Sequence, residues 1–569
     1  MSSAGKKNCA RVARIFSKSL AALLTLGVAF GAAFPAAGQV VDQTEHRLPP
    51  PPSEIQEGQD SDTSALEGPA GTKIAGDATK TFTLTAISVR GAEVFSSESF
   101  APLYDSYLAR RVSLADIAAI AEAITERYRK EGYFLSRAII PPQDIEGGYV
   151  VIDVIEGYVA DVVLAGDKVP AAEAIVDRIG AARPTKLSDL EHAMLLISDL
   201  RGVRIMRSAM LPDPDDLRRH TLALTLKADK FSASVYADNR GTEEVGRVQT
   251  FLQGAANSAL RSSDQIGAGL FFTPLDPNEL LFGQLYYTTP IGSSGLLATF
   301  SGSAARIRSG GALAAFDIEG ESIQAQARLS YPLVRTREFS LWSNLAFSMR
   351  RVEERRPALQ VYEDKIRSLI ASVNATWRRW NGTSTFYGEI VRGVGVLDAT
   401  ESGAAPVSRA NADGLFTRGK IEVARVQNIG EKVQLYVAAS GQGTDGPLLS
   451  SEEFAFGGAR YGRAYDYAAI AGDKGVAGSA ELRFGDKTKL PVLKSYQVFT
   501  FYDVGKVWNE EPLFFERDHA TISSAGAGVR LSLTDKVRAT YEAARPIDGL
   551  TGDFDDESWR HFFSLSASF

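Results

Sequence analysis

Two short motifs contain the residues best suited to a specific interaction in this chain. The first is the glycine-rich stretch Phe454–Asp466, which reads FAFGGARYGRAYD and includes Arg463. An apolar stretch that carries arginine suits a loop folded back into the protein interior better than a loop in solvent. The second, Phe501–Gly505, reads FYDVG and contains Asp503 at a strand position that can point inward. A charge-assisted hydrogen bond between a loop arginine and this carboxylate would contribute ~1.5–3 kcal/mol. From the spacing alone, such a pair and two separate solvated charges are equally favoured.

Residues that could support catalysis, a cofactor or a metal site are scattered. The five histidines form no H-E-x-x-H pair, and the single cysteine, Cys9, has no partner. The chain contains no G-x-x-x-x-G-K-[ST] phosphate loop and no G-x-S-x-G nucleophile elbow. The acidic stretch 548–557 could hold Ca²⁺ or bridge to lipopolysaccharide, but a solvated loop is the favoured interpretation. We therefore predict no enzyme, no catalytic residues, no cofactor and no metal site.

Composition narrows the class of protein further. The 569 residues are 44% hydrophobic, which excludes a wholly disordered chain. A net charge of −7 argues against a nucleic-acid-binding protein. The mean hydropathy of −0.09 excludes a helical membrane protein with many spans.

The N-terminus has the pattern of a secretory signal. Five basic residues precede an apolar run at 20–34, and small residues follow at 36–38. The alternative, a membrane anchor, needs roughly 20 apolar residues, which is more than this run provides. We predict a signal peptide over 1–38 and a proline-rich flexible linker over 39–80, where four consecutive prolines stand at 49–52.

Residues 81–228 predict two small α+β modules in tandem, 81–157 and 158–228. The first has a β-α-α-β-β order, with strands and helices expected over Thr81–Val89, Phe100–Arg111, Leu114–Glu131, Leu135–Ile140 and Tyr149–Ile155. The second repeats this order with elements expected over Tyr158–Leu164, Ala171–Ile179, Lys186–Leu200, Ile205–Leu211 and Thr221–Lys227. Each module is expected to form a three-stranded sheet with an exposed edge.

The segment 229–569 predicts a transmembrane barrel of about sixteen antiparallel β-strands. Helical periodicity disappears, and short alternating segments recur with about 21 residues for each strand and its connection, as in outer-membrane barrels. Short connections such as Asn381-Gly382 alternate with long ones such as 441–473. If the modules lie in the periplasm, the short turns lie on that side.

The last strand shows the barrel pattern most clearly. From Phe563 onward, Phe and Leu occupy one face and serines the other, and the chain ends at Phe569. An apolar face toward lipid and a polar face toward water is what a barrel wall requires. A soluble β-sandwich would alternate in the same way. Sixteen such strands behind a signal peptide favour the membrane barrel.

The order of these parts resembles the two-partner secretion transporters of the TpsB family, the haemolysin-activator type. Asp238–Thr242 is similar to the family's opening barrel strand and first turn. The loop motif of the family, V-R-G-[YF], is matched in altered form by Gly457, Gly458, Arg463, Tyr465 and Asp466. The strand motif F-x-D-x-G is matched fully by Phe501, Asp503 and Gly505.

The resemblance implies two POTRA domains in the periplasm, a sixteen-stranded barrel in the outer membrane, and a lumen loop held by an Arg463–Asp503 pair. It also implies Phe569 as the terminal aromatic residue that the barrel assembly machinery recognises. Family members often carry an N-terminal plug helix, but residues 39–47 are too short and polar to predict one.

The expected function is export of an unfolded partner exoprotein of the TpsA type, an adhesin or haemolysin, to the cell surface. Outer-membrane lipid and lipopolysaccharide are expected partners, whereas nucleic acid is not. The alternative is a factor that assembles other barrels, although such relatives usually carry three or more POTRA modules. The client, the resting pore size and the oligomeric state do not follow from the sequence.

Overall fold

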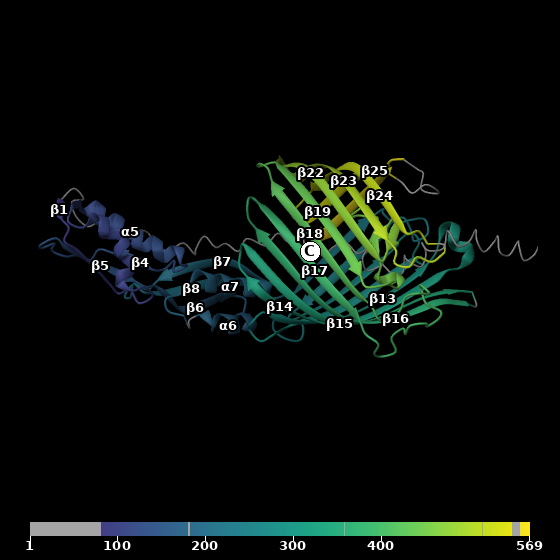
Figure 1. Ribbon diagram of the computed structural model, residues 1–569, viewed down its shortest axis with the longest axis horizontal. Coiled ribbons are helices and arrows are strands. Elements are labelled where there is room, and N and C mark those ends of the chain that lie inside the picture. Colours follow the sequence, from purple (N-terminus) through teal and green to yellow (C-terminus); the bar gives the residue numbers. More distant parts are fainter. Residues whose placement is uncertain (1–80, 180–181, 358, 515, 549–557) are drawn as a thin grey trace, which may run out of the picture.

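The computed structural model describes residues 81–179, 182–357, 359–514, 516–548 and 558–569. The predicted signal peptide, the linker and residues 549–557 of the acidic stretch lie outside these ranges. Two α+β modules precede a β-barrel along the longest axis of the molecule (Figure 1). No helix in the described ranges is long and apolar enough to cross a membrane.

The first module is a three-stranded sheet covered by one long helix, with a small two-stranded sheet beside it. The elements are β1 (Thr81–Thr83), β2 (Ala86–Arg90), a 3₁₀ turn (Ser97–Phe100), α4 (Ala101–Tyr104), a second 3₁₀ turn (Asp105–Tyr107), β3 (Arg111–Ser113), α5 (Leu114–Lys130), β4 (Arg137–Ile139) and β5 (Tyr149–Ile155). The sheet order is β2-β5-β4, with β2 parallel and β4 antiparallel to the central strand.

The long helix α5 forms because its sequence caps its own start and presents one apolar face. The Ser113 hydroxyl accepts a hydrogen bond from the Asp116 amide, and the Asp116 carboxylate accepts one from the Ser113 amide. The hydrogen bonds that the Ser113 amide and hydroxyl donate to the Asp116 carboxylate lower the pKa of Asp116 below its usual value. Ile117, Ile120 and Ile124 recur at helical spacing and are fully buried against the sheet.

The predicted helix Phe100–Arg111 is largely wrong. Only short helical turns form there, because the chain from residue 108 onward pairs with the start of the module. The Leu84 amide donates to the Arg110 carbonyl at 3.0 Å, and the Ala109 amide donates to the Leu84 carbonyl at 2.9 Å. This tertiary pairing outweighs local helix propensity.

The second module repeats the first. It consists of β6 (Tyr158–Gly166), α6 (Pro170–Val176), α7 (Leu187–Asp199), β7 (Val203–Pro212) and β8 (Arg219–Ala228). Its sheet order is β6-β8-β7, again with the first strand parallel and the third antiparallel to the central one. Phe134 and Leu135 of the first module pack into the core of the second, so the two modules share a fixed joint.

The barrel predicted for the rest of the chain is confirmed. Sixteen antiparallel strands of the described residues form a closed ring, because β26 pairs with β9. They are β9 (Phe231–Asp238), β10 (Gln249–Asn257), β11 (Gln265–Phe272), β12 (Leu280–Ile291), β13 (Leu296–Arg308), β14 (Glu319–Arg335), β15 (Phe339–Arg356), β16 (Leu359–Arg378), β17 (Gly382–Gly393), β18 (Thr417–Asn428), β19 (Val433–Thr444), β22 (Lys474–Leu490), β23 (Leu493–Trp508), β24 (His519–Ser532), β25 (Val537–Asp548) and β26 (Arg560–Ser568). Short 3₁₀ turns lie in two connections, at Gly311–Phe316 and Ser450–Glu452.

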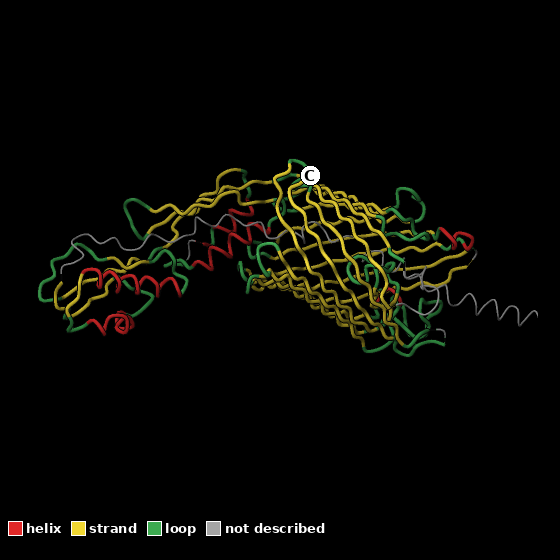
Figure 2. Tube along the Cα trace, turned by 90° about the horizontal axis from the view of Figure 1, so that it is seen from above, coloured by secondary structure: helices red, strands yellow, loops and turns green. Residues whose placement is uncertain are grey.

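The two ends of the barrel differ in their connections. Turns on the side of the modules are short, such as 379–381 and 533–536, whereas the far side carries the long connections 394–416 and 445–473. Figure 2 shows the modules extending from one end of the barrel.

The last strand distinguishes the outer surface from the lumen. Phe563, Leu565 and Phe569 are more than half exposed on the outer wall, as expected for a surface that faces lipid. Phe562 points inward and is 6% exposed, and the Arg240 guanidinium lies 4.0 Å from the centre of its ring. This aromatic residue on the otherwise polar face is therefore part of the lumen packing.

The second module is attached to the short turns of the barrel. The Arg335 guanidinium at the end of β14 donates two hydrogen bonds to the Asp199 carboxylate of α7, at 2.9 and 2.6 Å. Arg337 forms a second ion pair with Glu191 of the same helix at 3.2 Å. The Ala171 amide of α6 donates to the hydroxyl of Ser262, which lies in the turn between β10 and β11.

Candidate functional site

A hairpin from the far side of the barrel folds back into the lumen. Its strands are β20 (Phe454–Phe456) and β21 (Ile470–Gly472), which pair with each other, and we call residues 454–472 the lumen loop. Its aromatic side chains are buried in one cluster with inward-facing residues of the wall from β19 to β26. The aromatic members from the loop are Phe454, Phe456, Tyr461 and Tyr465.

Glycines make the close packing of this loop possible. The φ angles of Gly457 and Gly458 are +125° and +101°, a region that side chains other than glycine rarely adopt. On the wall, a Cβ at Gly475 would lie 2.1 Å from the ring of Phe454, and one at Gly505 would lie 2.0 Å from the ring of Phe456. The loop rings therefore occupy the space that wall side chains would otherwise fill.

Arg463 is the polar centre of the loop. Its guanidinium donates to both carboxylate oxygens of Asp503 on β23, at 3.0 Å each, and its backbone amide donates to the same carboxylate at 3.1 Å. Both side chains are buried, with Asp503 fully inaccessible. A bidentate bond between planar groups fixes orientation as well as distance.

Four further wall residues contact the same guanidinium. Glu481 accepts a hydrogen bond from Arg463 at 2.6 Å, and the Ser479 hydroxyl accepts another at 3.1 Å. Glu542 lies 3.8 Å away as an ion-pair partner. The guanidinium carbon also lies 3.4 Å from the centre of the Phe501 ring, a cation–π contact.

The surrounding arginines balance these carboxylates. Glu481 also binds Arg530 at 2.6 Å and Arg483 at 2.7 Å. Glu542 binds Arg240 at 2.6 Å, and Arg240 in turn donates to the Arg463 carbonyl at 3.3 Å. The result is a network that joins the loop to β22, β23, β24, β25 and the segment after β9. We call it the Arg463 network.

The other residues of the predicted loop motif lie around this centre. The Tyr465 hydroxyl donates to the Ser523 carbonyl at 3.1 Å and the Asp548 carbonyl at 2.6 Å, which ties the loop to β24 and β25. Asp466 does not reach Arg463 and instead forms an ion pair with Arg560 on β26. Gly457 and Gly458 shape the loop as described above.

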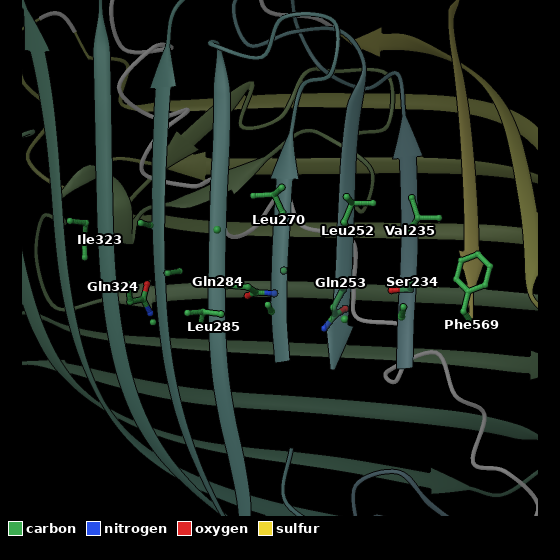
Figure 3. A pocket seen from close by; sticks show the side chains of 18 residues that line it. Ser234, Val235, Leu252, Gln253, Leu270, Gln284, Leu285, Ile323, Gln324 and Phe569 are labelled. Carbon is green, nitrogen blue, oxygen red and sulfur yellow. The ribbon is translucent and has the colours of Figure 1, made fainter. Parts of the chain in front are cut away.

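Phe569 is not brought into this site. It lies on the outer wall, where it borders an open cavity of about 930 Å³ together with Val235, Leu252, Leu270 and Ile323 (Figure 3). Its amide donates to the Ala233 carbonyl at 2.8 Å and so extends the pairing of β26 with β9.

The sequence prediction missed several partners of Arg463. Glu481 and Glu542 stand at strand positions whose side chains point into the lumen. A charged residue at such a position is the feature of the sequence that could have identified them. A second buried pair was also missed, in which Arg409 binds Asp473 at 2.5 Å and joins two long connections on the far side. No group of three His, Cys, Asp or Glu side chains that could hold a metal ion occurs in the described ranges.

Together the fold and the lumen loop define a closed sixteen-stranded β-barrel with α+β modules at one end and a loop packed inside it. The family of haemolysin secretion/activation proteins, described as ShlB/FhaC/HecB, matches residues 222–531, and a ShlB-type POTRA domain matches residues 82–157. The chain belongs to this family. It is an outer-membrane transporter of two-partner secretion, which exports a partner exoprotein and whose POTRA domain lies in the periplasm.

Individual proteins agree with this assignment. The heme/hemopexin transporter protein HuxB of Haemophilus influenzae is 24% identical over 503 residues, which cover 85% of this chain and 86% of HuxB. The outer membrane transporter CdiB of Escherichia coli is 28% identical over 169 residues, about 30% of either chain.

Solved structures share the fold. CdiB from Escherichia coli superposes with a TM-score of 0.72 at 19% identity and covers 93% of this chain and 98% of its own. BamA from Haemophilus ducreyi, in a form lacking POTRA domains 1–3, superposes with a TM-score of 0.50 at 13% identity, covering 86% and 100%.

Proposed function

We propose that both α+β modules, 81–157 and 158–228, act as POTRA domains that receive an unfolded exoprotein in the periplasm. The barrel, 229–569, then conducts the exoprotein to the cell surface. In this proposal the lumen loop, anchored by Arg463, sets the conformation of the pore or its gate. The client is expected to be of the adhesin or haemolysin type.

The topology of the second module supports its role as a POTRA domain. Its sheet has the same arrangement as the sheet of the matched first module: the first strand is parallel to the central strand, and the third is antiparallel. Because each sheet has three strands, its two outer strands carry backbone groups that no further strand of the sheet pairs.

Strand addition is the physical mode of capture that we propose. An extended chain can add to a sheet edge through backbone hydrogen bonds, and this binding tolerates varied side chains. The edge strands β6 and β7 of the second module also expose apolar side chains, since Val163, Met206 and Leu211 are all about half exposed. A long unfolded client fits such a surface better than a folded one.

The Arg463 network is the observation that carries the proposed role of the lumen loop. One side chain from the loop binds carboxylates on two wall strands at hydrogen-bond distance and lies near a third. Breaking a buried charge pair by removing one partner typically costs ~3–5 kcal/mol, so the loop position depends strongly on this residue.

Direction of transport needs no nucleotide in this proposal. The sequence contains no phosphate-binding loop, and folding of the client outside the cell would prevent its return.

The decisive experiment compares the proteins of the medium and of the outer membrane in cells with and without this gene. Loss of one large secreted protein, with other barrels unchanged, is expected and would identify the client. Depleted outer-membrane barrels with an unchanged medium would instead indicate an assembly factor and would overturn the proposal.

A further inference from the structure

One part of the lumen wall, formed by β10 to β13, differs in charge from the rest. On these strands the outward residues include Leu252, Leu270 and Leu285, each 40% or more exposed. The residues that alternate with them point into the lumen, and none of these inward positions carries a charged side chain. We call this surface the neutral wall.

A continuous row of small and amide side chains crosses the neutral wall. Strand register places its members directly opposite one another on neighbouring strands. In order from β9 to β14 they are Ser234, Gln253, Gly269, Gln284, Ser303 and Gln324. Figure 3 shows the four of them that it labels on one line across the strands.

The opposite part of the lumen, from β17 to β25, is charged and already occupied. Its inward side chains include Glu389, Arg418, Glu481, Asp503, Arg530 and Glu542. These charges are paired with each other or with the lumen loop, as in Arg418 with Glu389 at 3.1 Å. The aromatic cluster of the loop packs against the same side. Movement of a client along this wall would have to break those pairs.

The chemistry of the neutral wall suits an extended polypeptide backbone. A glutamine side chain both donates and accepts hydrogen bonds, so it can pair with the N–H or C=O group of any residue. Charge-assisted hydrogen bonds are roughly twice as strong as neutral ones, and a transported species must be bound weakly enough to leave. A wall of neutral donors and acceptors can therefore bind a client of varied sequence weakly enough to release it.

An apolar cluster lies at the far end of the neutral wall. Val245, from the connection between β9 and β10, packs with Phe251, Phe271 and Phe282 in an apolar cluster. These contacts include no buried charge pair. A chain that advances along the wall would have to displace this cluster and the backbone hydrogen bond that the Gly310 amide donates to the Glu244 carbonyl at 2.8 Å.

We propose that the neutral wall of β10 to β13, and the row through Gln253 and Gln284 in particular, is the surface along which an extended, unfolded client moves. This inference rests on the proposed function, because it names the path inside the barrel that the exported chain takes.

Photo-crosslinking tests the path with a defined probe. A photoreactive amino acid is placed at Gln284, or at the matched control Gln434, which lies opposite Arg483 in the charged part of the lumen. The purified full-length protein is then mixed with a biotin-tagged, unstructured peptide of Gly, Ser, Thr and Asn. Adducts at position 284 that exceed those at 434 are expected. Equal or stronger adducts at 434, or none at 284, would overturn the inference.

Charge insertion tests the same path during secretion. Gln284→Lys and Gln284→Glu are both expected to lower secretion about tenfold, the factor that corresponds to about 1.4 kcal/mol of tighter binding of the client to the wall. Gln284→Asn is expected to secrete at the normal level. Gln434→Glu is the control and is expected to secrete normally, and heat-modifiable migration of each variant checks barrel folding. Normal secretion by both charged variants at 284 would exclude this path. An unchanged medium after gene deletion would instead contradict the proposed function itself.

Discussion

The ring of Phe456 fills the space that a side chain at Gly505 would need, because a Cβ at Gly505 would lie 2.0 Å from a ring carbon of Phe456. Gly505 belongs to the wall strand that carries Asp503, and Phe456 belongs to the lumen loop that carries Arg463. The glycine of the F-x-D-x-G motif is therefore needed for contact between loop and wall, in addition to any role in the strand itself. Apolar packing and the buried ion pair hold the loop at the same place.

Gly505→Ala is expected to displace the loop and lower secretion. Overpacking of this kind costs ~1–3 kcal/mol, so the temperature at which the barrel loses its heat-modifiable form should also fall. The control is Gly443→Ala, because nothing lies within 4 Å of a Cβ at that position. Adding Phe456→Leu to Gly505→Ala should restore part of the secretion. No effect of Gly505→Ala on either measurement would contradict the packing argument.

Arg463→Ala is expected to abolish or strongly reduce secretion while the barrel still inserts. The substitution leaves Asp503 and Glu481 buried with fewer partners, at a cost of ~3–5 kcal/mol. Arg463→Lys should not restore function, because an ammonium group cannot form the bidentate bond. Arg460→Ala is the control, since its side chain is 69% exposed and pairs with Glu422, which lies outside the Arg463 network. Normal export by Arg463→Ala would remove the proposed role of this residue.

Asp199→Asn is expected to loosen the second module from the barrel. The carboxylate holds Arg335 through two hydrogen bonds, and hydrogen bonds to charged groups contribute ~1.5–3 kcal/mol. Distances between spin labels on α6 and on the turn between β24 and β25 should become broader. Glu191→Gln is the milder comparison, because its partner Arg337 is 42% exposed. An unchanged distance distribution would show that the remaining contacts hold the second module to the barrel without this pair.

We expect His220 to make the stability of the second module depend on pH. Burial lowers the pKa of His220, with Arg137 of the first module acting in the same direction. The folded state therefore prefers the neutral ring, so this contribution to stability is complete above the ordinary pKa of about 6.5 and declines as pH falls below it. Amides of β6 and β8 should exchange faster at about pH 5.5 than at about pH 7.5, after correction for intrinsic rates. His220→Gln should remove this difference, and a difference that persists would assign it to another group.

Phe569→Ala is expected to reduce the amount of protein in the outer membrane with little effect on the folded barrel. The side chain is 72% exposed, so its removal leaves no cavity in the core. Leu565→Ala is the matched control, an outward residue of the same strand that is 51% exposed and not terminal. Equal loss of both variants from the membrane would show a general effect of the outer wall rather than recognition of the last residue.

Local patterns in the sequence were sufficient for much of the architecture. The strand Tyr149–Ile155 has the predicted bounds in the structure, and the predicted set of alternating strands after residue 229 forms the closed barrel. In the barrel, alternation predicts strands well because the wall faces lipid on one side and the lumen on the other, so residue type alternates with the direction of the side chain. The helix predicted over Phe100–Arg111 failed because a partner strand from the start of the module competes for its backbone.

The sequence by itself determined the alternating strands, the tandem modules and the two motifs that contain Arg463 and Asp503. Only the tertiary structure decided how many charges those motifs bring together. Arg240 and Glu542 are 302 positions apart in the chain and meet because β26 closes the ring against β9. Their contact depends on strand register and closure, which are global properties of the sheet. Local residue patterns therefore do not specify strand register or ring closure directly.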